Sequence, residues 1–258
     1  MLLEVCTDSV EGVRAAAEGG AGRVELCSAL SEGGLTPSAG LISAAVAAGK
    51  ERQLPVFVLI RPRGGDFVFS DDEMRVMAED VRACGRMGVA GVVIGALSPD
   101  GTIDEAITAV LLGIAREAGL DVTFHRAFDL VADQATALDT LIALGCHRVL
   151  TSGGDVCAAS EQGAHTIAAL VARAAGRIGI MAGGGLTPDN VSSLVAATRV
   201  TEVHGSARRP VPSSMANRRP GVALGAATSA MAGGEHCDRL ATHTGTVRAM
   251  AEAARGAC

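Results

Sequence analysis

The chain opens with MLLEVCTDSVEGVRAAAEGGAGRVELCS (residues 1–28), in which two short apolar runs flank an Ala-rich stretch. Leu2–Thr7 and Arg23–Ser28 have the length and composition of buried strands, and Val10–Glu18 carries Ala, Val and charged residues at helical spacing. A strand, a helix and a strand in so short a segment predict a parallel β-α-β unit with a right-handed crossover.

The same alternation continues along the chain. Eight strand-like runs alternate with helical runs, and eight repeats favour closure into a barrel over an open sheet. An open doubly wound sheet would normally carry a glycine fingerprint after its first strand, where this chain has Thr7-Asp8-Ser9. We therefore predict an α/β fold, a single (β/α)8 TIM barrel with parallel strands spanning residues 1–258. The predicted strands are Leu2–Thr7, Arg23–Ser28, Val56–Arg61, Gly91–Ala96, Asp121–Ala127, Arg148–Ser152, Arg177–Ala182 and Glu202–Ser206. The helices include Val10–Glu18, Ser38–Ala48, Asp71–Arg86, Glu105–Ala118 and Gln134–Leu144.

Two turn segments and the C-terminal tail add detail to the predicted fold. Gly33–Pro37 and Gly184–Pro188 are the same five residues, GGLTP, each placed between a strand and a helix. Thr suits a helix N-cap and Pro suits the first turn, so convergent turn chemistry and an internal duplication explain the repeat equally well. Residues 208–246 are predicted to form an extended loop region, and residues 247–254 the last outer helix.

Composition excludes several classes of protein. The formal net charge is −6, and no basic cluster of the kind that nucleic-acid binding requires is present. The sequence has no apolar run long enough for a membrane span and no basic N-terminal leader, which predicts a cytoplasmic protein. Seven cysteines without a CxxC pair argue against a disulfide framework and for reduced thiols.

Charged residues lie inside or at the ends of apolar strands. Glu4 and Glu25 come from neighbouring strands and Arg61 from the next, and buried charges are costly unless paired. The three form either a structural ion-pair plug or an acid/base site in which Arg61 holds an anion. His125 and His204, at two further strand ends, favour the functional site because imidazole titrates near neutral pH. We expect Arg61 within hydrogen-bond reach of a glutamate, and the cluster beside a cavity.

Glycines after the later strands form a second candidate site. In TIM barrels the loops after strands seven and eight often bind phosphate through backbone N–H groups. Tight turns alone would also explain these glycines. The candidate anion-binding residues are Arg61, Gly183, Gly184, Gly185, Gly205 and Ser206.

Cys6 and Cys27 form a third candidate site. Each lies two residues beyond a glutamate on adjacent strands, and neighbouring strands are about 4.8 Å apart, so both sulfurs can approach one ion. Two thiolates favour a soft ion such as Cu(I). The alternative is that both are small buried apolar residues.

Several long and unusual motifs are spread along the chain. They are Glu4–Ser9 (EVCTDS), Arg23–Ser28 (RVELCS), Ile60–Phe67 (IRPRGGDF), Thr123–Asp129 (TFHRAFD), Leu150–Gly154 (LTSGG), Gly183–Asn190 (GGGLTPDN) and His204–Ala207 (HGSA). Together they resemble the motifs of the copper homeostasis protein CutC family. The likeness covers nearly the whole chain and implies a TIM barrel, a cytoplasmic location, a homo-oligomer (a dimer or tetramer) and copper handling. It also implies a Cu(I) site at Cys6 and Cys27.

The leading hypothesis is therefore a CutC-like copper homeostasis protein with Cys6 and Cys27 as ligands. The alternative is a TIM-barrel enzyme that acts by acid/base chemistry on a small anionic or phosphorylated metabolite. In that enzyme Glu4, Glu25, His125 or His204 would handle protons and Arg61 would hold the anion. A purely structural assembly module is a third possibility, but it leaves the polar cluster unused.

Overall fold

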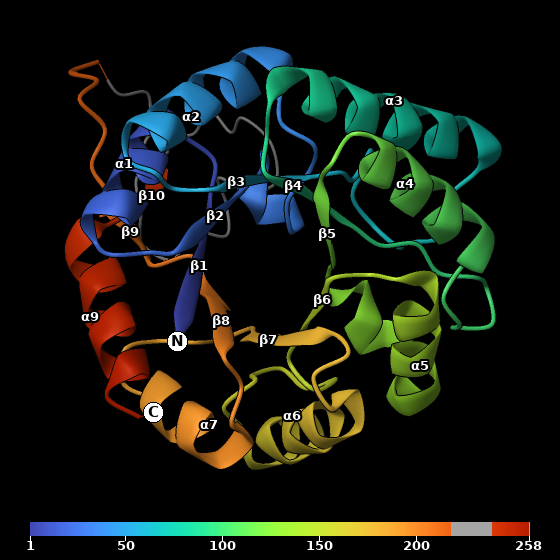
Figure 1. Ribbon diagram of the computed structural model, residues 1–258. Coiled ribbons are helices and arrows are strands. Elements are labelled where there is room, and N and C mark those ends of the chain that lie inside the picture. Colours follow the sequence, from blue (N-terminus) through green and yellow to red (C-terminus); the bar gives the residue numbers. More distant parts are fainter. Residues whose placement is uncertain (218–238, 258) are drawn as a thin grey trace.

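Strands and helices alternate throughout the computed structural model, which describes residues 1–217 and 239–257 (Figure 1). The strands form a closed barrel inside a ring of helices, which confirms the predicted TIM barrel. The barrel strands are β1 (Leu2–Thr7), β2 (Arg23–Leu26), β3 (Val56–Leu59), β4 (Gly91–Ile94), β5 (Asp121–Phe124), β6 (Arg148–Thr151), β7 (Gly179–Gly183) and β8 (Glu202–Gly205). The helices are α1 (Val10–Glu18), α2 (Ala39–Glu51), α3 (Asp71–Met87), α4 (Glu105–Glu117), α5 (Gln134–Leu144), α6 (Glu161–Ala174), α7 (Val191–Thr198) and α9 (Thr244–Arg255), with 3-10 turns η1 (Leu30–Glu32) and η2 (Arg126–Leu130).

Each barrel strand pairs in parallel with the next, and β8 closes the barrel against β1. The register places Glu4 opposite Arg23 on one side and opposite His204 on the other, and places Cys6 opposite Glu25. Because partners opposite each other in a parallel pair face the same side of the sheet, this register gathers these side chains inside the barrel.

The side chains of each strand divide between two cores. Outward residues such as Val5 and Val24 join the large apolar layer between barrel and helices. Inward residues make a much smaller apolar cluster, so the interior of the barrel keeps room for polar side chains. That inner cluster consists of Cys6, Cys27, Phe57, Leu59 and Val93.

The N-termini of α2 and α7 differ from what the two GGLTP segments predict. Ser38, not Thr36, caps α2 by accepting the Leu41 N–H, and α7 begins after Asn190, not at Thr187. Thr36 is engaged across the barrel rim instead, where its Oγ1 accepts the backbone N–H of Arg61 at 2.9 Å. The two GGLTP segments therefore do not cap their helices in the way that their composition suggests.

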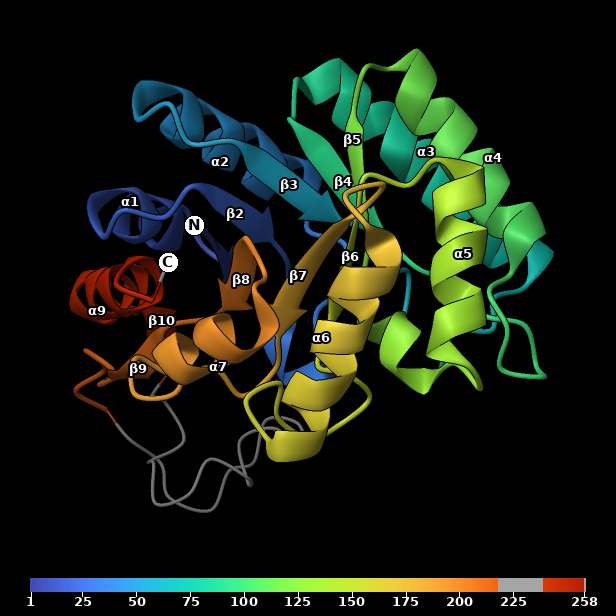
Figure 2. The same ribbon diagram turned by 60° about the horizontal axis from the view of Figure 1, so that its bottom comes forward.

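The tail contains more structure than an extended loop. Within residues 208–246, β9 (Arg208–Val211) and β10 (Arg239–Thr242) pair as an antiparallel two-stranded sheet, while residues 218–238 lie outside the described part of the chain. The last helix, α9, begins at Thr244, three residues before the predicted start, because His243 caps it. Figure 2 shows α9 between α1 and α7, where it completes the outer ring.

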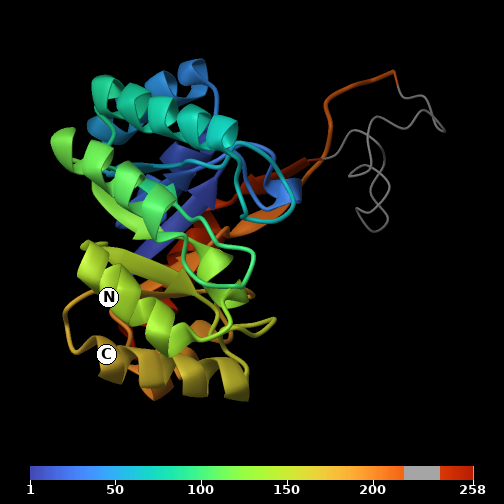
Figure 3. The same cartoon turned by 90° about the vertical axis from the view of Figure 1, so that its right-hand side faces the viewer.

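The β9–β10 sheet projects from the end of the barrel at which the strands finish (Figure 3). Thr242 Oγ1 donates to Thr7 Oγ1, at the end of β1, over 3.0 Å. Among residues 1–217 and 239–257, no helix combines the length and apolar character that crossing a membrane requires.

Candidate functional site

An ion-pair network crosses the barrel interior near the N-terminal ends of the strands, since Arg23, Arg148 and Glu202 are the first residues of β2, β6 and β8. Arg23 donates through Nε to Glu4 and through Nη2 to Glu202 at 2.5 Å, and Arg148 Nε donates to Glu202 at 3.2 Å. The Arg23 guanidinium also stacks over the Phe57 ring at 5.0 Å. Arg23 was not among the predicted site residues, yet it forms a direct ion pair with Glu4.

His204 connects this network to the residues at the C-terminal end of the barrel. Its Nδ1 lies 2.8 Å from Glu4 Oε1, and its Nε2 lies 3.7 Å from Glu25 Oε2. Burial opposes a charge on either partner, but the hydrogen bonds and opposite charges prevail. The pKa of Glu4 falls to about 2, and the pKa of His204 rises well above its ordinary value. His204 is therefore an imidazolium held between two glutamates.

The two predicted cysteine ligands face each other. Cys6 Sγ and Cys27 Sγ lie 3.7 Å apart, and both residues are buried. The hydrogen bond from Cys27, aided by His204 against the opposing effect of burial, lowers the pKa of Cys6 to about 5. The same bond and burial raise the pKa of Cys27 well above its ordinary value. At neutral pH the pair is one thiolate, Cys6, hydrogen-bonded by one thiol, Cys27.

Glu25 lies beside the cysteines. Burial and the neighbouring Cys6 charge raise the pKa of its carboxyl group to about 8, so it is largely protonated at neutral pH. Donor atoms of Cys6, Glu25 and Cys27 lie within 4.8 Å of one another, as do those of Glu4, Glu25 and His204. Two candidate ligand groups therefore share Glu25, one rich in sulfur and one made of oxygen and nitrogen.

Arg61 does not pair with either glutamate, and that prediction was wrong. Its guanidinium donates to three backbone carbonyls, those of Glu32 at 2.8 Å, Gly34 at 3.0 Å and Gly65 at 2.8 Å. The register explains the difference. Glu25 lies opposite Phe57, whereas Arg61 is four residues further along the chain, beyond the end of β3 at Leu59 and therefore nearer the barrel mouth.

A cavity of about 130 Å³ lies above the polar cluster, as expected for a functional site. Of the five residues proposed for the enzyme site, Glu25, Arg61, His125 and His204 line it, whereas Glu4 does not. Burial and the Arg61 charge lower the pKa of His125 to about 3, so its ring is neutral. The remaining lining residues are Cys6, Gly33, Leu59, Phe67, Arg126 and Leu150.

The predicted glycines do not line this cavity. Gly183 and Gly205 are the last residues of β7 and β8. The carbonyl oxygen of Gly184 accepts a hydrogen bond from Ala158, in the loop between β6 and α6, and that of Gly185 accepts one from Asn190, just before α7. Ser206 follows β8 outside the cavity lining, so Arg61 is the one predicted anion-binding residue that reaches the space.

Comparison with known proteins places the chain in a family. The CutC family model matches residues 1–209, which contain all of the residues that line the mouth cavity or form the ion-pair network. The chain belongs to the CutC family. It is 49% identical over 228 residues to the Homo sapiens protein named copper homeostasis protein cutC homolog, covering 88% of this chain and 81% of that one. It is 51% identical over 221 residues to a CutC family protein of Xylella fastidiosa, covering 85% and 80% of the two chains.

Solved structures agree. The putative copper homeostasis protein CutC from Streptococcus agalactiae superimposes with a TM-score of 0.75 at 36% identity, covering 80% of this chain and 98% of that one. Deoxyribose phosphate aldolase from Aeropyrum pernix aligns with a TM-score of 0.59 at 14% identity, covering 79% and 85% of the two chains, and shares only the barrel fold. The CutC match ends at residue 209, so β10 and α9 lie beyond the matched segment.

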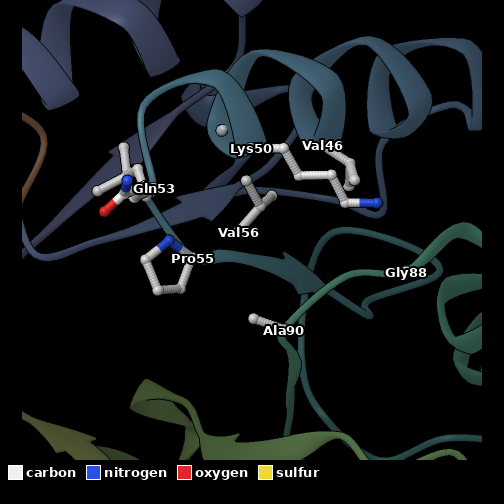
Figure 4. A pocket seen from close by; sticks show the side chains of 9 residues that line it. Val46, Lys50, Gln53, Pro55, Val56, Gly88 and Ala90 are labelled. Atoms are coloured by element: carbon white, nitrogen blue, oxygen red, sulfur yellow. The ribbon is translucent and has the colours of Figure 1, made fainter.

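A second cavity of this CutC-family protein, about 340 Å³, lies away from the cluster (Figure 4). It opens between the end of α2 and the start of β3, and most of its wall is apolar. Lys50 extends along one side as its single charged group. Its wall thus contains a single titratable side chain, whereas the smaller cavity has several, so the smaller one is the candidate site.

Proposed function

We propose that this CutC-family protein binds Cu(I) through Cys6 and Cys27. The observation that carries the proposal is the buried sulfur pair, 3.7 Å apart, on β1 and β2. Metal–thiolate bonds are about 2.3 Å long in zinc sites, so one ion of similar size can reach both sulfurs. Soft thiolates select Cu(I) over hard cations.

The surroundings of the pair support this assignment. Cys6 is already a thiolate at neutral pH, which removes one proton from the cost of binding a cation. His204 supplies a positive charge close to that thiolate, and Glu4 and Arg23 hold His204 in place from below. Glu25 adds an oxygen within reach of both sulfurs. The pair is thus set in a polar shell rather than in a purely apolar core.

The human relative is named for copper homeostasis, and at 49% identity this supports the same role here over the alternative of an acid/base enzyme. The five cysteines that the structure describes are free. A thiol pair this close would oxidise in an oxidising compartment, so the proposal includes a cytoplasmic location, where thiols stay reduced. A homo-oligomer of two or four chains stays a prediction.

Cu(I) titration of the reduced protein against a Cu(I) chelator tests the proposal. We expect about one tightly bound ion per chain and loss of that binding in the Cys6→Ser, Cys27→Ser double variant. The loss should exceed the roughly 10–100-fold effect of removing a hydrogen-bond partner of a ligand.

Cys157→Ser is the matched control. Cys157 lies outside the site, donating to the Gly185 carbonyl at 3.4 Å, and a hydroxyl can keep that bond. Its Cu(I) affinity should equal that of the unmodified protein. Unchanged affinity in the double variant, with native circular dichroism, would overturn the assignment.

A further inference from the structure

The mouth cavity contains a buried hydrogen-bond donor without an acceptor. The backbone N–H of Ala127 donates to His125 Nδ1 at 3.1 Å, so in the neutral ring the proton must be on Nε2. That Nε2 has no hydrogen-bond partner among the described residues, and His125 is only 6% exposed. Leaving a buried donor unpaired is costly, so this position favours a ligand with an acceptor atom.

Arg61 adds a charge without a direct ion pair beside it. Its terminal nitrogens donate to neutral carbonyls alone, its Nε has no partner in the described chain, and the residue is 6% exposed. The guanidinium stays charged at every relevant pH, and the Glu32 carboxylate acts on it only from beyond contact distance, so a bound anion would be favourable here. Phe67 stacks against it at 4.9 Å and holds its plane, but supplies no negative charge.

Arg126 contributes a second guanidinium to the cavity wall. Its Nε donates to Asp129 at 2.7 Å and its Nη2 to Ser152 Oγ at 2.8 Å, so its plane is fixed. Asp129 is itself fixed by the Ser152 N–H at 3.0 Å and by Thr151 Oγ1 at 2.5 Å. Such an anchored fork is typical of arginines that bind carboxylate or phosphate groups.

The acidic member of the cavity lining, Glu25, is paired with His204, whose Nε2 lies 3.7 Å from Glu25 Oε2. The cavity volume of about 130 Å³ suits one small oxyanion.

We propose that this cavity binds a small molecule through an oxyanion group, a carboxylate or a phosphate, to which Arg61, His125 and Arg126 donate hydrogen bonds. Cys6 of the sulfur pair also lines this cavity, but none of the three donors is a proposed copper ligand, so anion binding does not require copper. The backbone glycines after β7 and β8 are not required, because the donors are side chains.

The test uses the metal-free, reduced protein and two probes, inorganic phosphate and acetate, titrated separately at constant ionic strength. Nitrogen–proton NMR signals of Arg61 Nε and His125 Nε2 report on the site directly. We expect both signals to shift with at least one probe. Shifts with phosphate alone point to a phosphorylated ligand, and shifts with acetate alone point to a carboxylate.

Variants make the result decisive. Arg61→Met should weaken binding of the effective probe by roughly tenfold or more, since hydrogen bonds to charged groups contribute about 1.5–3 kcal/mol. Arg126→Met should weaken it as well, and provides a second reading if the first variant folds poorly. Arg75→Met, an exposed arginine of α3 paired with Asp72, is the matched control and should bind like the unmodified protein.

Two results would overturn the proposal. One is that neither probe shifts the two signals at concentrations of several tens of millimolar. The other is binding that is unchanged in both Arg61→Met and Arg126→Met. Because no copper is present in any sample, these results leave the Cu(I) proposal untouched, and the cysteine variants test that separately.

Discussion

Arg23 and Arg61 are both buried arginines inside one barrel, but their surroundings are opposite. Arg23 lies near the N-terminal ends of the strands, in contact with the carboxylates of Glu4 and Glu202. Arg61 lies at the mouth, where only carbonyl oxygens accept its hydrogen bonds. A paired charge of this kind holds a fold together, whereas an unpaired one beside a cavity is suited to an external anion. The comparison therefore separates the scaffold of the site from its binding surface.

The largest expected loss of stability is for substitution of Arg23, the ion-paired arginine. Arg23→Met removes the cation that Glu4 and Glu202 share, and leaves the buried Glu4 carboxylate with His204 alone and the half-buried Glu202 with Arg148 alone. It should therefore destabilise the protein by about 3–5 kcal/mol. Urea denaturation followed by circular dichroism measures the change. Arg52→Met, which removes an exposed ion pair with Glu18, is the control and should cost less than about 1 kcal/mol. Similar losses in the two variants would mean that the Arg23 ion pairs are not a structural network.

The second effect is a pH dependence that originates at the mouth. Unfolded His125 titrates near its ordinary pKa of 6.5, whereas the folded ring has a pKa of about 3. Between these values the unfolded chain binds a proton that the folded chain does not, so stability falls as pH is lowered. From about pH 8 to about pH 5 the loss from this residue should be about 2 kcal/mol.

Other groups titrate in the same range, so the useful quantity is the difference between two proteins. His125→Gln cannot gain the proton, and its free energy of unfolding should vary less with pH by that amount. Denaturant curves at several pH values, in a buffer without phosphate, provide the measurement. Parallel pH profiles for the two proteins would show that His125 is not held neutral.

The smallest expected loss of stability is for substitution of Arg61, the arginine without an ion pair. Arg61→Met removes three hydrogen bonds to carbonyls, but it leaves no buried carboxylate behind and water in the cavity can replace the donors. We expect a loss of about 1 kcal/mol, well below that of Arg23→Met. Thermal or urea unfolding in the absence of anions checks this. A loss as large as that of Arg23→Met would place Arg61 in the structural network and erase the contrast.

Much of the inner layer followed from residue spacing. The period of two along a strand placed Glu4 with Cys6 and Glu25 with Cys27, and the structure brings the two cysteines together. Arg23 was overlooked because it stands at the first position of its strand, directly after Gly22, where a charged residue is usually exposed. Its inward direction follows from the same period, since it is two residues before Glu25 and four before Cys27.

The positions of side chains along the barrel axis could not be predicted from the sequence. Arg61 was expected beside the glutamates because its strand is adjacent, but the register between strands depends on packing that the sequence does not display. Arg126 was within a quoted motif and received no role, although it follows His125 directly. The β9–β10 pairing joins segments separated by 27 intervening residues, and Pro210 in β9 conceals a strand that a periodicity search would otherwise find.

The pairing of β1 with β8, which closes the barrel, joins the barrel strands that are made first and last. Cys6 and Cys27 are 21 residues apart on strands made consecutively, so their sulfurs can meet as soon as the first β-α-β unit forms. His204 reaches Glu4 across a separation of 200 residues, and closing so long a loop is slow. The two cysteines are therefore synthesised long before His204, and the contact that holds His204 beside them can form only after β8 has been made.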